Sequence, residues 1–333
     1  MKIAVIGGGS WGTALAQLLA NKSEQVSLWA YEEEVVRAIT RKHENTRYLP
    51  GISLSKNLTA SSDLQKILEG AKVVLFVVPS QHARPILSAM APFIKKETPV
   101  VSATKGIEIK TLLMISEVIR EGLNRDDNDK IAVLSGPSFA QEVTQNHPTA
   151  VTLAAINPRL ALRLLHLLET PTFRLLISSD TLGVQVGGAL KNVIAIAAGI
   201  SDGLGFGFNT KAILMTRGLS EITSLGTAMG ACMDTFYGLS GLGDLFLTCS
   251  GALSRNRKVG ELLGQGVSLE SILNKMQTVA EGVKTTQSAI LLSKKYKVQM
   301  PIVQEVYRVL FEGKPPKQAV SDLMAQAYGK EFC

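Results

Sequence analysis

The fold is decided by residues 2–20, which read KIAVIGGGSWGTALAQLLA. The segment Lys2–Ile6, rich in Ile and Val, predicts a strand, and the run Thr13–Ala20 predicts a helix. The turn between them has the pattern GxGxxG, formed by Gly7, Gly9 and Gly12. In such a turn the first glycine allows a sharp bend, the second lets the backbone approach a pyrophosphate, and the third lets helix and strand pack closely. Because the pattern lies between a strand and a helix, it favours dinucleotide binding over a ligand-free turn.

The rest of the first half alternates short apolar runs with longer helix-compatible stretches, which is typical of βαβ units and a parallel sheet. The further strands are predicted at Val26–Trp29, Val73–Val78, Pro99–Ala103, Ile131–Leu134, Ala150–Ala154 and Phe173–Ile177. From about residue 183 the pattern changes to a 3.6-residue period, as in Val184–Ala198 and Lys211–Leu225. We therefore expect a doubly wound, mostly parallel Rossmann-type α/β domain over residues 1–183 and an all-α domain over residues 184–333.

The composition is that of a soluble globular protein. Of the 333 residues, 46% are hydrophobic and 19% are charged, and the length suits two domains. The net charge is +7, but Lys and Arg are spread along the chain, so we expect a small anionic substrate and no nucleic acid. Three consecutive glycines oppose a signal peptide at the start, and no run approaches the roughly 20 apolar residues of a membrane span. We expect no membrane span.

Cysteine and histidine spacing gives no sign of a metal site. The cysteines are odd in number and lack CxxC spacing, which argues against a disulfide framework or zinc; they are Cys232, Cys249 and Cys333. The histidines are scattered without an HExxH pattern, at His43, His82, His147 and His166. We expect no metal and a reducing, cytoplasmic location.

The choice between NAD and NADP depends on the end of the second strand. An acid there hydrogen-bonds the ribose 2′-OH and favours NAD. Glu32 lies about where that acid is expected. It equally suits the opening of the next helix, where Glu32, Glu33 and Glu34 interact favourably with the helix dipole. Both cofactors stay open at this point.

Residues suited to a substrate site follow several predicted strands. In an open α/β sheet, ligands bind beyond the carboxyl ends of the strands. The residues at those ends are Pro79, Lys105, Gly106, Gly136, Pro137 and Ser138. Turn chemistry explains the glycines and prolines but leaves Lys105 unexplained.

The second half contains a lysine in an apolar helix. Lys191 lies within GGALKNVIAIAAG, residues 187–199, most of which we expect to be buried. Burial disfavours the charged form and lowers the pKa of a lysine, which suits it to acid–base catalysis near neutral pH. The alternative is a lysine whose ammonium reaches water at the surface. The residues alone favour neither.

A basic cluster follows Asp244 in the segment GLGDLFLTCSG. The cluster is SRNRK, residues 254–258, at the predicted start of a helix. A helix N-terminus, an arginine able to bind two oxygens, and hydroxyl and amide donors together predict a phosphate site. The alternative is an ordinary capped helix, but positive charge in its first turn opposes the dipole.

With these residues in place, the chain resembles the bacterial NAD(P)-dependent glycerol-3-phosphate dehydrogenases over essentially its whole length. The motifs that carry the resemblance are GGGSWGTALA at residues 7–16, NTRYLPG at 45–51, VVPSQ at 77–81, ATKG at 103–106, SGPSFAQE at 135–142, ALKN at 189–192, GLGDL at 241–245, SRN at 254–256 and VAEGV at 279–283.

The resemblance implies a Rossmann domain followed by a helical domain of the 6-phosphogluconate-dehydrogenase-like kind. It implies that Lys191 is the catalytic acid/base, and that Lys105 and Arg255 contact both cofactor and substrate. Further substrate contacts would come from Gly136, Ser138, Asp244, Ser254 and Asn256. Further cofactor contacts would come from Ser10, Trp11, Ala140, Val279 and Glu281. Tyr31 stands where many relatives have a basic residue, which puts NADP preference in doubt but leaves stacking on adenine open.

The implied reaction is hydride transfer between NAD(P)H and dihydroxyacetone phosphate, giving sn-glycerol 3-phosphate for phospholipid synthesis. Since dimers are the commonest soluble assembly, we expect a homodimer. One alternative is a 6-phosphogluconate or 3-hydroxyacid dehydrogenase, whose substrates carry a carboxylate. Another is a catalytically silent NAD(P)H-binding regulator, which would not need Lys191, Asp244 and the SRN cluster.

Overall fold

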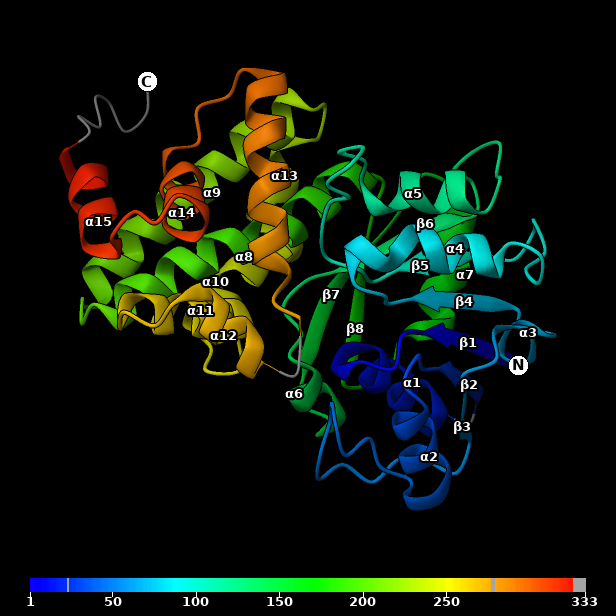
Figure 1. Ribbon diagram of the computed structural model, residues 1–333. Coiled ribbons are helices and arrows are strands. Elements are labelled where there is room, and N and C mark those ends of the chain that lie inside the picture. Colours follow the sequence, from blue (N-terminus) through cyan, green and yellow to red (C-terminus); the bar gives the residue numbers. More distant parts are fainter. Residues whose placement is uncertain (23, 277–278, 326–333) are drawn as a thin grey trace. The chain divides into compact units, whose positions relative to one another are not determined.

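Strand β1 (Lys2–Ile6) lies between β2 (Gln25–Trp29) and β4 (Val73–Phe76), and it is parallel to both (Figure 1). The computed structural model describes residues 1–22, 24–276 and 279–325; Cys333, one of the three cysteines named above, lies outside them. The direction in which successive strands are added to the sheet changes at β1, because β2 and β3 (Leu58–Ser61) lie on one side of it and β4 lies on the other. Gly7 follows β1 directly, so the glycine turn lies at the switch point where α/β sheets bind ligands.

Eight strands form a single sheet in the order β3-β2-β1-β4-β5-β6-β7-β8. The other strands are β3 (Leu58–Ser61), β5 (Val100–Ser102), β6 (Ile131–Ser135), β7 (Thr149–Ala155) and β8 (Phe173–Ser178). All neighbours are parallel except β6 and β7, which are antiparallel. The predicted mostly parallel sheet is confirmed. The prediction missed β3, a four-residue edge strand with a single fully buried residue.

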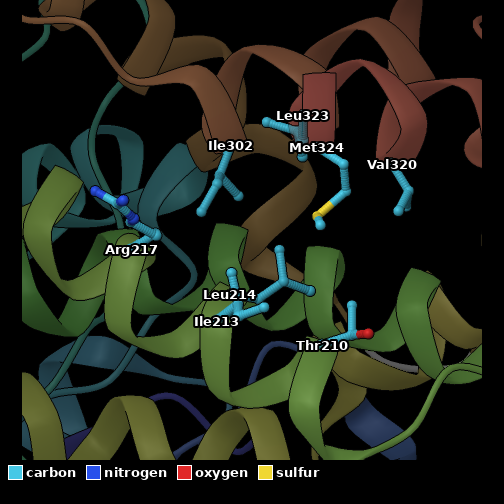
Figure 2. Close-up of a pocket in the computed structure, with 8 residues that line it drawn as sticks. All are labelled: Thr210, Ile213, Leu214, Arg217, Ile302, Val320, Leu323 and Met324. Carbon is cyan, nitrogen blue, oxygen red and sulfur yellow. The ribbon is translucent and has the colours of Figure 1, made fainter. Parts of the chain in front are cut away.

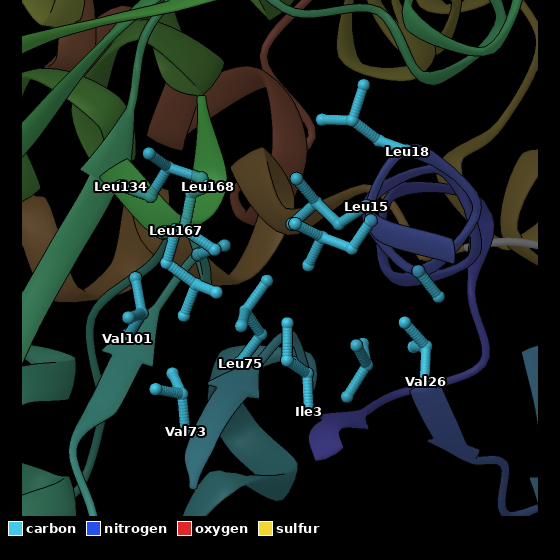
Figure 3. Packing of buried hydrophobic residues seen from close by; sticks show 14 of the residues in the cluster. Ile3, Leu15, Leu18, Val26, Val73, Leu75, Val101, Leu134, Leu167 and Leu168 are labelled. Atoms are coloured by element: carbon cyan, nitrogen blue, oxygen red, sulfur yellow. The ribbon is translucent and has the colours of Figure 1, made fainter. Parts of the chain in front are cut away.

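Apolar side chains alternate between the two faces of the sheet. Ile3 and Val5 of β1 belong to one buried cluster, whereas Ala4 and Ile6 belong to another. Figure 3 shows the first cluster, where Leu15 of α1 lies over the strands with leucines of α7. Because both faces are buried, β1 and β4 are apolar at nearly every position. The helices of this half are α1 (Ser10–Asn21), α2 (Glu33–Lys42), α3 (Leu64–Leu68), α4 (Ala83–Met90), α5 (Ile115–Gly122), α6 (Ala140–Thr144) and α7 (Pro158–Leu168).

The chain divides into two compact units, Met1–Gln185 and Val186–Cys333. The described part of the second unit is helical and contains no strand. Its elements are the greater part of α8 (Thr181–Gly203), α9 (Phe208–Ala228), α10 (Asp244–Ser250), α11 (Arg255–Gly264), α12 (Leu269–Lys275), α13 (Glu281–Tyr296), α14 (Pro301–Phe311) and α15 (Pro316–Ala325). Ser254 and Ser268 cap α11 and α12.

Helix α8 is long and apolar enough to cross a membrane by length and composition, but its most apolar window is fully buried. Burial of this kind is typical of the core helix of a soluble protein.

Helices α8 and α11 touch through their backbones. A Cβ added to Gly199 of α8 would lie 1.9 Å from the carbonyl oxygen of Arg257, and one added to Gly260 of α11 would lie 2.0 Å from that of Ile196. Gly203 and Gly264 make a second close approach. Four glycines thus hold the first turn of α11 against the helix that carries Lys191.

Candidate active site

The glycine turn after β1 has the geometry of a phosphate-binding turn. Gly7 has a φ of 123°, which excludes other residues, and a Cβ there would lie 2.5 Å from the Val77 carbonyl oxygen. A Cβ on Gly12 would lie 1.9 Å from the carbonyl oxygen of Gly7. By contrast, nothing lies within 4 Å of a Cβ on Gly9, and no side chain caps α1 there. The first-turn N–H groups of α1 can therefore meet a phosphate.

The NTRYLPG loop is fastened to this turn. Asn45 donates from its Nδ2 to the Gly8 carbonyl oxygen at 2.8 Å, and the Ser10 hydroxyl donates to the Tyr48 carbonyl oxygen at 2.6 Å. The indole N–H of Trp11 is buried and has no hydrogen-bond partner among the described residues. An open glycine, an uncapped helix and an unpaired donor fit a bound dinucleotide.

The end of β2 presents Tyr31 and Glu32. Tyr31 is 77% exposed, with its ring 6.4 Å from that of Trp29. Glu32 precedes the first residue of α2, but its carboxylate does not cap that helix. It accepts a hydrogen bond from the Tyr48 hydroxyl at 2.6 Å instead. Glu32 thus opens α2 as its N-cap residue, as one of the two interpretations above describes, while its carboxylate binds Tyr48.

A second group in this unit joins residues from two strand ends. The Lys105 ammonium and the Ser138 hydroxyl donate to the same Gly136 carbonyl oxygen, at 3.1 Å and 2.9 Å. Gly136 has a φ of 145°, and a Cβ there would lie 2.9 Å from the Val151 Cα. Ala140 follows as the first residue of α6. The structure thus brings Lys105, Gly136 and Ser138 together. Lys105 contacts a residue at a second strand end, which a role in its own turn does not require.

In the second unit, the Lys191 ammonium is buried and paired. It lies 2.5 Å from Asp244 Oδ1 and 2.7 Å from the Thr248 hydroxyl oxygen, and Lys191 is only 6% exposed. This geometry excludes the surface lysine considered above. Asp244 is 1% exposed and begins α10 directly after a π-helical turn at Leu239–Gly243, an irregularity often found at functional sites. A buried carboxylate keeps a buried ammonium charged and fixes its position.

The SRN residues form the first turn of α11 beside α8. The Ser254 hydroxyl accepts from the Arg257 N–H at 3.2 Å and so caps the helix, which Arg255 begins. The Asn256 side chain donates to Asn192 Oδ1 and accepts from the backbone N–H of Gly282, each at 2.9 Å.

These contacts tie α8, α11 and the N-terminus of α13 together. Glu281 is the first residue of α13, and Val279, two residues before it, is 48% exposed. The capped helix of the alternative considered above is present, and Asn256 additionally links α11 to two further elements.

A buried ion network anchors the same turn. Asp202 on α8 accepts from Arg257 at 2.6 Å and from Lys211 on α9 at 2.8 Å. All three side chains are less than one-fifth exposed. Arg257 and Lys211 thus form structural ion pairs with Asp202.

An apolar pocket in this unit lies apart from these residues. Figure 2 shows Leu214 and Arg217 of α9 on one side, and Ile302 of α14 and Met324 of α15 on the other. It contains none of the predicted site residues. Among the described residues, no group of His, Cys, Asp or Glu side chains could hold a metal ion.

Sequence reasoning missed four residues of these clusters. Asn45, Tyr48 and Asn192 lay in the quoted motifs without a role, and Thr248 was not singled out. Thr248 follows Asp244 by four residues on one helix, a spacing that places both on the same face and could have revealed it. Tyr48 and Asn192 depend on contacts between distant segments, which no local pattern reveals.

Comparison with known proteins agrees with this arrangement. Family models for the N-terminus and C-terminus of NAD-dependent glycerol-3-phosphate dehydrogenase match residues 2–161 and 180–321. A glycerol-3-phosphate dehydrogenase [NAD(P)+] from Geobacter sp. (strain M21) is 53% identical over 98% of this chain and 97% of its own. One from Syntrophotalea carbinolica is 50% identical over the full length of both.

A solved structure gives the same answer for the fold. The glycerol-3-phosphate dehydrogenase of Coxiella burnetii is 40% identical, with a TM-score of 0.93 over 98% of this chain and 99% of its own. With both family models matched and relatives at half identity, the chain belongs to the NAD-dependent glycerol-3-phosphate dehydrogenase family.

Proposed function

We propose that this chain interconverts dihydroxyacetone phosphate and sn-glycerol 3-phosphate by reversible hydride transfer with NAD(P)H. The observation that carries the proposal is the buried contact of Lys191 with Asp244 and Thr248. A fully buried ion pair is costly to maintain for stability alone. A role of the Lys191 ammonium in the reaction would explain why the chain keeps this ion pair despite its free-energy cost.

Lys191 acts as the acid/base of the reaction. The bound nicotinamide supplies the hydride to C2 in the reducing direction. Lys191 donates a proton to the oxygen on C2 as negative charge develops there, and in the oxidising direction it removes the hydroxyl proton. Asp244 and Thr248 accept hydrogen bonds from the ammonium and so fix its direction.

The substrate phosphate is bound by the first turn of α11. Ser254 caps this helix, Arg255 supplies a guanidinium able to contact two oxygens, and Asn256 holds the turn against α8. Binding a group remote from the reacting carbon orients the carbonyl. Asn192, which bonds Asn256 directly, belongs to this group. In the first unit, Lys105, Gly136 and Ser138 complete the substrate contacts.

The first unit is the dinucleotide-binding domain, and the second is the substrate domain. The cofactor phosphates bind at the glycine turn, where Gly9 leaves open space and α1 lacks a side-chain cap. Further cofactor contacts are assigned to Ser10, Trp11, Tyr31, Lys105, Ala140, Arg255, Val279 and Glu281. We further assign the chain to the cytoplasm as a homodimer that supplies glycerol 3-phosphate for phospholipid synthesis.

The test is the initial rate of NADH and NADPH oxidation with dihydroxyacetone phosphate, compared with unphosphorylated dihydroxyacetone. A phosphate-anchored site should lose most of its kcat/KM on the unphosphorylated ketone. Equal rates on the two ketones would reject the phosphate site. Absence of turnover by folded protein with either cofactor would reject the reaction.

A further inference from the structure

The carboxylate of Glu32 is fixed beside the glycine turn by a chain of hydrogen bonds. Asn45 and Ser10 fasten the loop of residues 45–51 to that turn. From this loop, the Tyr48 hydroxyl donates to Glu32 Oε1 at 2.6 Å. The loop thus connects the phosphate-binding turn to the end of β2.

Glu32 retains one unused acceptor. Tyr48 occupies Oε1, while Oε2 has no hydrogen-bond partner among the described residues. Glu32 is half-buried, so its position is more restricted than that of a surface carboxylate. An acceptor held at the end of the second strand suits the ribose 2′-OH of NAD, which donates a hydrogen bond.

The charges around this carboxylate oppose a 2′-phosphate. Glu32, Glu33 and Glu34 follow one another, and the residue before them is the uncharged Tyr31. The arginine of the neighbouring loop, Arg47, is paired with Glu34 and lies over the Tyr48 ring at 5.2 Å from its centre. A 2′-phosphate would meet carboxylates where it requires a cation.

We infer that Glu32, positioned by Tyr48, makes this chain prefer NADH to NADPH. The inference rests on the proposed function and deepens it by choosing between the two cofactors. Glu32 affects cofactor preference in two ways. Glu32 accepts a hydrogen bond from the 2′-OH of NADH, and it repels the 2′-phosphate of NADPH. Like charges at such a half-buried position should give a preference on the order of tenfold or more.

The experiment measures dissociation constants of NADH and NADPH by nicotinamide fluorescence in the absence of any ketone. The wild-type chain is compared with Glu32→Gln and Tyr48→Phe. The matched control is Glu33→Gln, which removes an exposed carboxylate that accepts from the Ser62 hydroxyl. Thermal unfolding of each variant checks that it is folded.

The wild type should bind NADH more tightly, and Glu32→Gln should reduce the ratio of the two constants about tenfold. Tyr48→Phe should reduce this ratio less, because the Glu32 carboxylate keeps its charge but loses the hydrogen bond that positions it. Glu33→Gln should leave it nearly unchanged. Raising the salt concentration should narrow the ratio in wild type and not in Glu32→Gln, since salt screens repulsion of the 2′-phosphate.

Two results would overturn the inference without touching the proposed function: equal or tighter binding of NADPH by the wild type, or an unchanged ratio in folded Glu32→Gln. Failure of the folded wild-type chain to bind either cofactor would instead reject the dinucleotide site, and with it both the inference and the proposed function.

Discussion

Replacing Gly199 with alanine tests how the packing of α8 on α11 controls the site. The added Cβ would lie 1.9 Å from the Arg257 carbonyl oxygen and 2.8 Å from the Glu261 nitrogen. Real Cβ atoms essentially never approach within 3.0 Å of another heavy atom, so the two backbones must separate by about 1.1 Å. The movement falls on the first turn of α11, which carries Arg255 and Asn256.

The energy of this change should be modest but its effect on catalysis large. Forcing a methyl group into a packed contact costs about 1–3 kcal/mol. Alanine in place of a helical glycine offsets about 1 kcal/mol of that cost. The variant should therefore fold, with a net loss of at most about 2 kcal/mol. A misplacement of about 1 Å in substrate-positioning groups can lower kcat/KM about 100-fold.

The assay is steady-state reduction of dihydroxyacetone phosphate, with urea unfolding of the same samples. Gly207→Ala is the control, because nothing lies within 4 Å of a Cβ at Gly207 and its φ is −89°. We expect Gly207→Ala to keep nearly wild-type kcat/KM, and Gly199→Ala to lose about 100-fold. A folded Gly199→Ala enzyme with wild-type kcat/KM would refute the claim that this packing positions the site.

Three further substitutions test other parts of the account. Asp244→Asn leaves the Lys191 ammonium beside a neutral amide, so kcat should fall and urea unfolding should show a loss of about 3–5 kcal/mol; unchanged values would show that the pair is dispensable. Burial raises the pKa of Glu221 from 4.5 to about 8, although its carboxylate accepts from the backbone N–H of Ile302. Its stabilising contribution should be complete below about pH 4.5 and lost as the pH rises through about 8. The free energy of unfolding of the wild type should therefore fall over this range relative to that of Glu221→Gln. Parallel plots of unfolding free energy against pH for the two proteins would contradict this. Arg255→Ala should lower kcat/KM for dihydroxyacetone phosphate about 10- to 100-fold and lower that for dihydroxyacetone less, because only the first substrate loses a phosphate contact in addition to the cofactor contact; an equal loss on both would place Arg255 away from the phosphate.

The sequence predicted those features that depend on local pattern. Short apolar runs located seven of the eight strands, because strands of a sheet covered on both faces are apolar at nearly every position, and a 3.6-residue period located the helical half. The glycine turn was predictable because Gly7 and Gly12 meet steric limits that only glycine satisfies. Strand β3 was missed because LTAS at a sheet edge carries little apolar pattern.

The remainder depends on contacts between distant segments. The sequence left Lys191 undecided between burial and exposure, and its pairing with Asp244, 53 residues away, decides the question. Likewise, the bond of Glu32 to Tyr48, 16 residues away, could not be read from the sequence. Such pairs follow from tertiary packing, which apolar period and motif spacing do not specify.

The central claim, that Lys191 transfers the proton at the C2 oxygen, is tested most directly by kcat of Lys191→Ala with dihydroxyacetone phosphate at saturating cofactor. Cofactor binding, measured by fluorescence, should be unchanged, because Lys191 is not among the residues assigned to contact the cofactor. The account predicts a loss in kcat of about 10²–10⁴-fold or more in a folded variant that still binds the cofactor. Turnover close to wild type in that variant would contradict it.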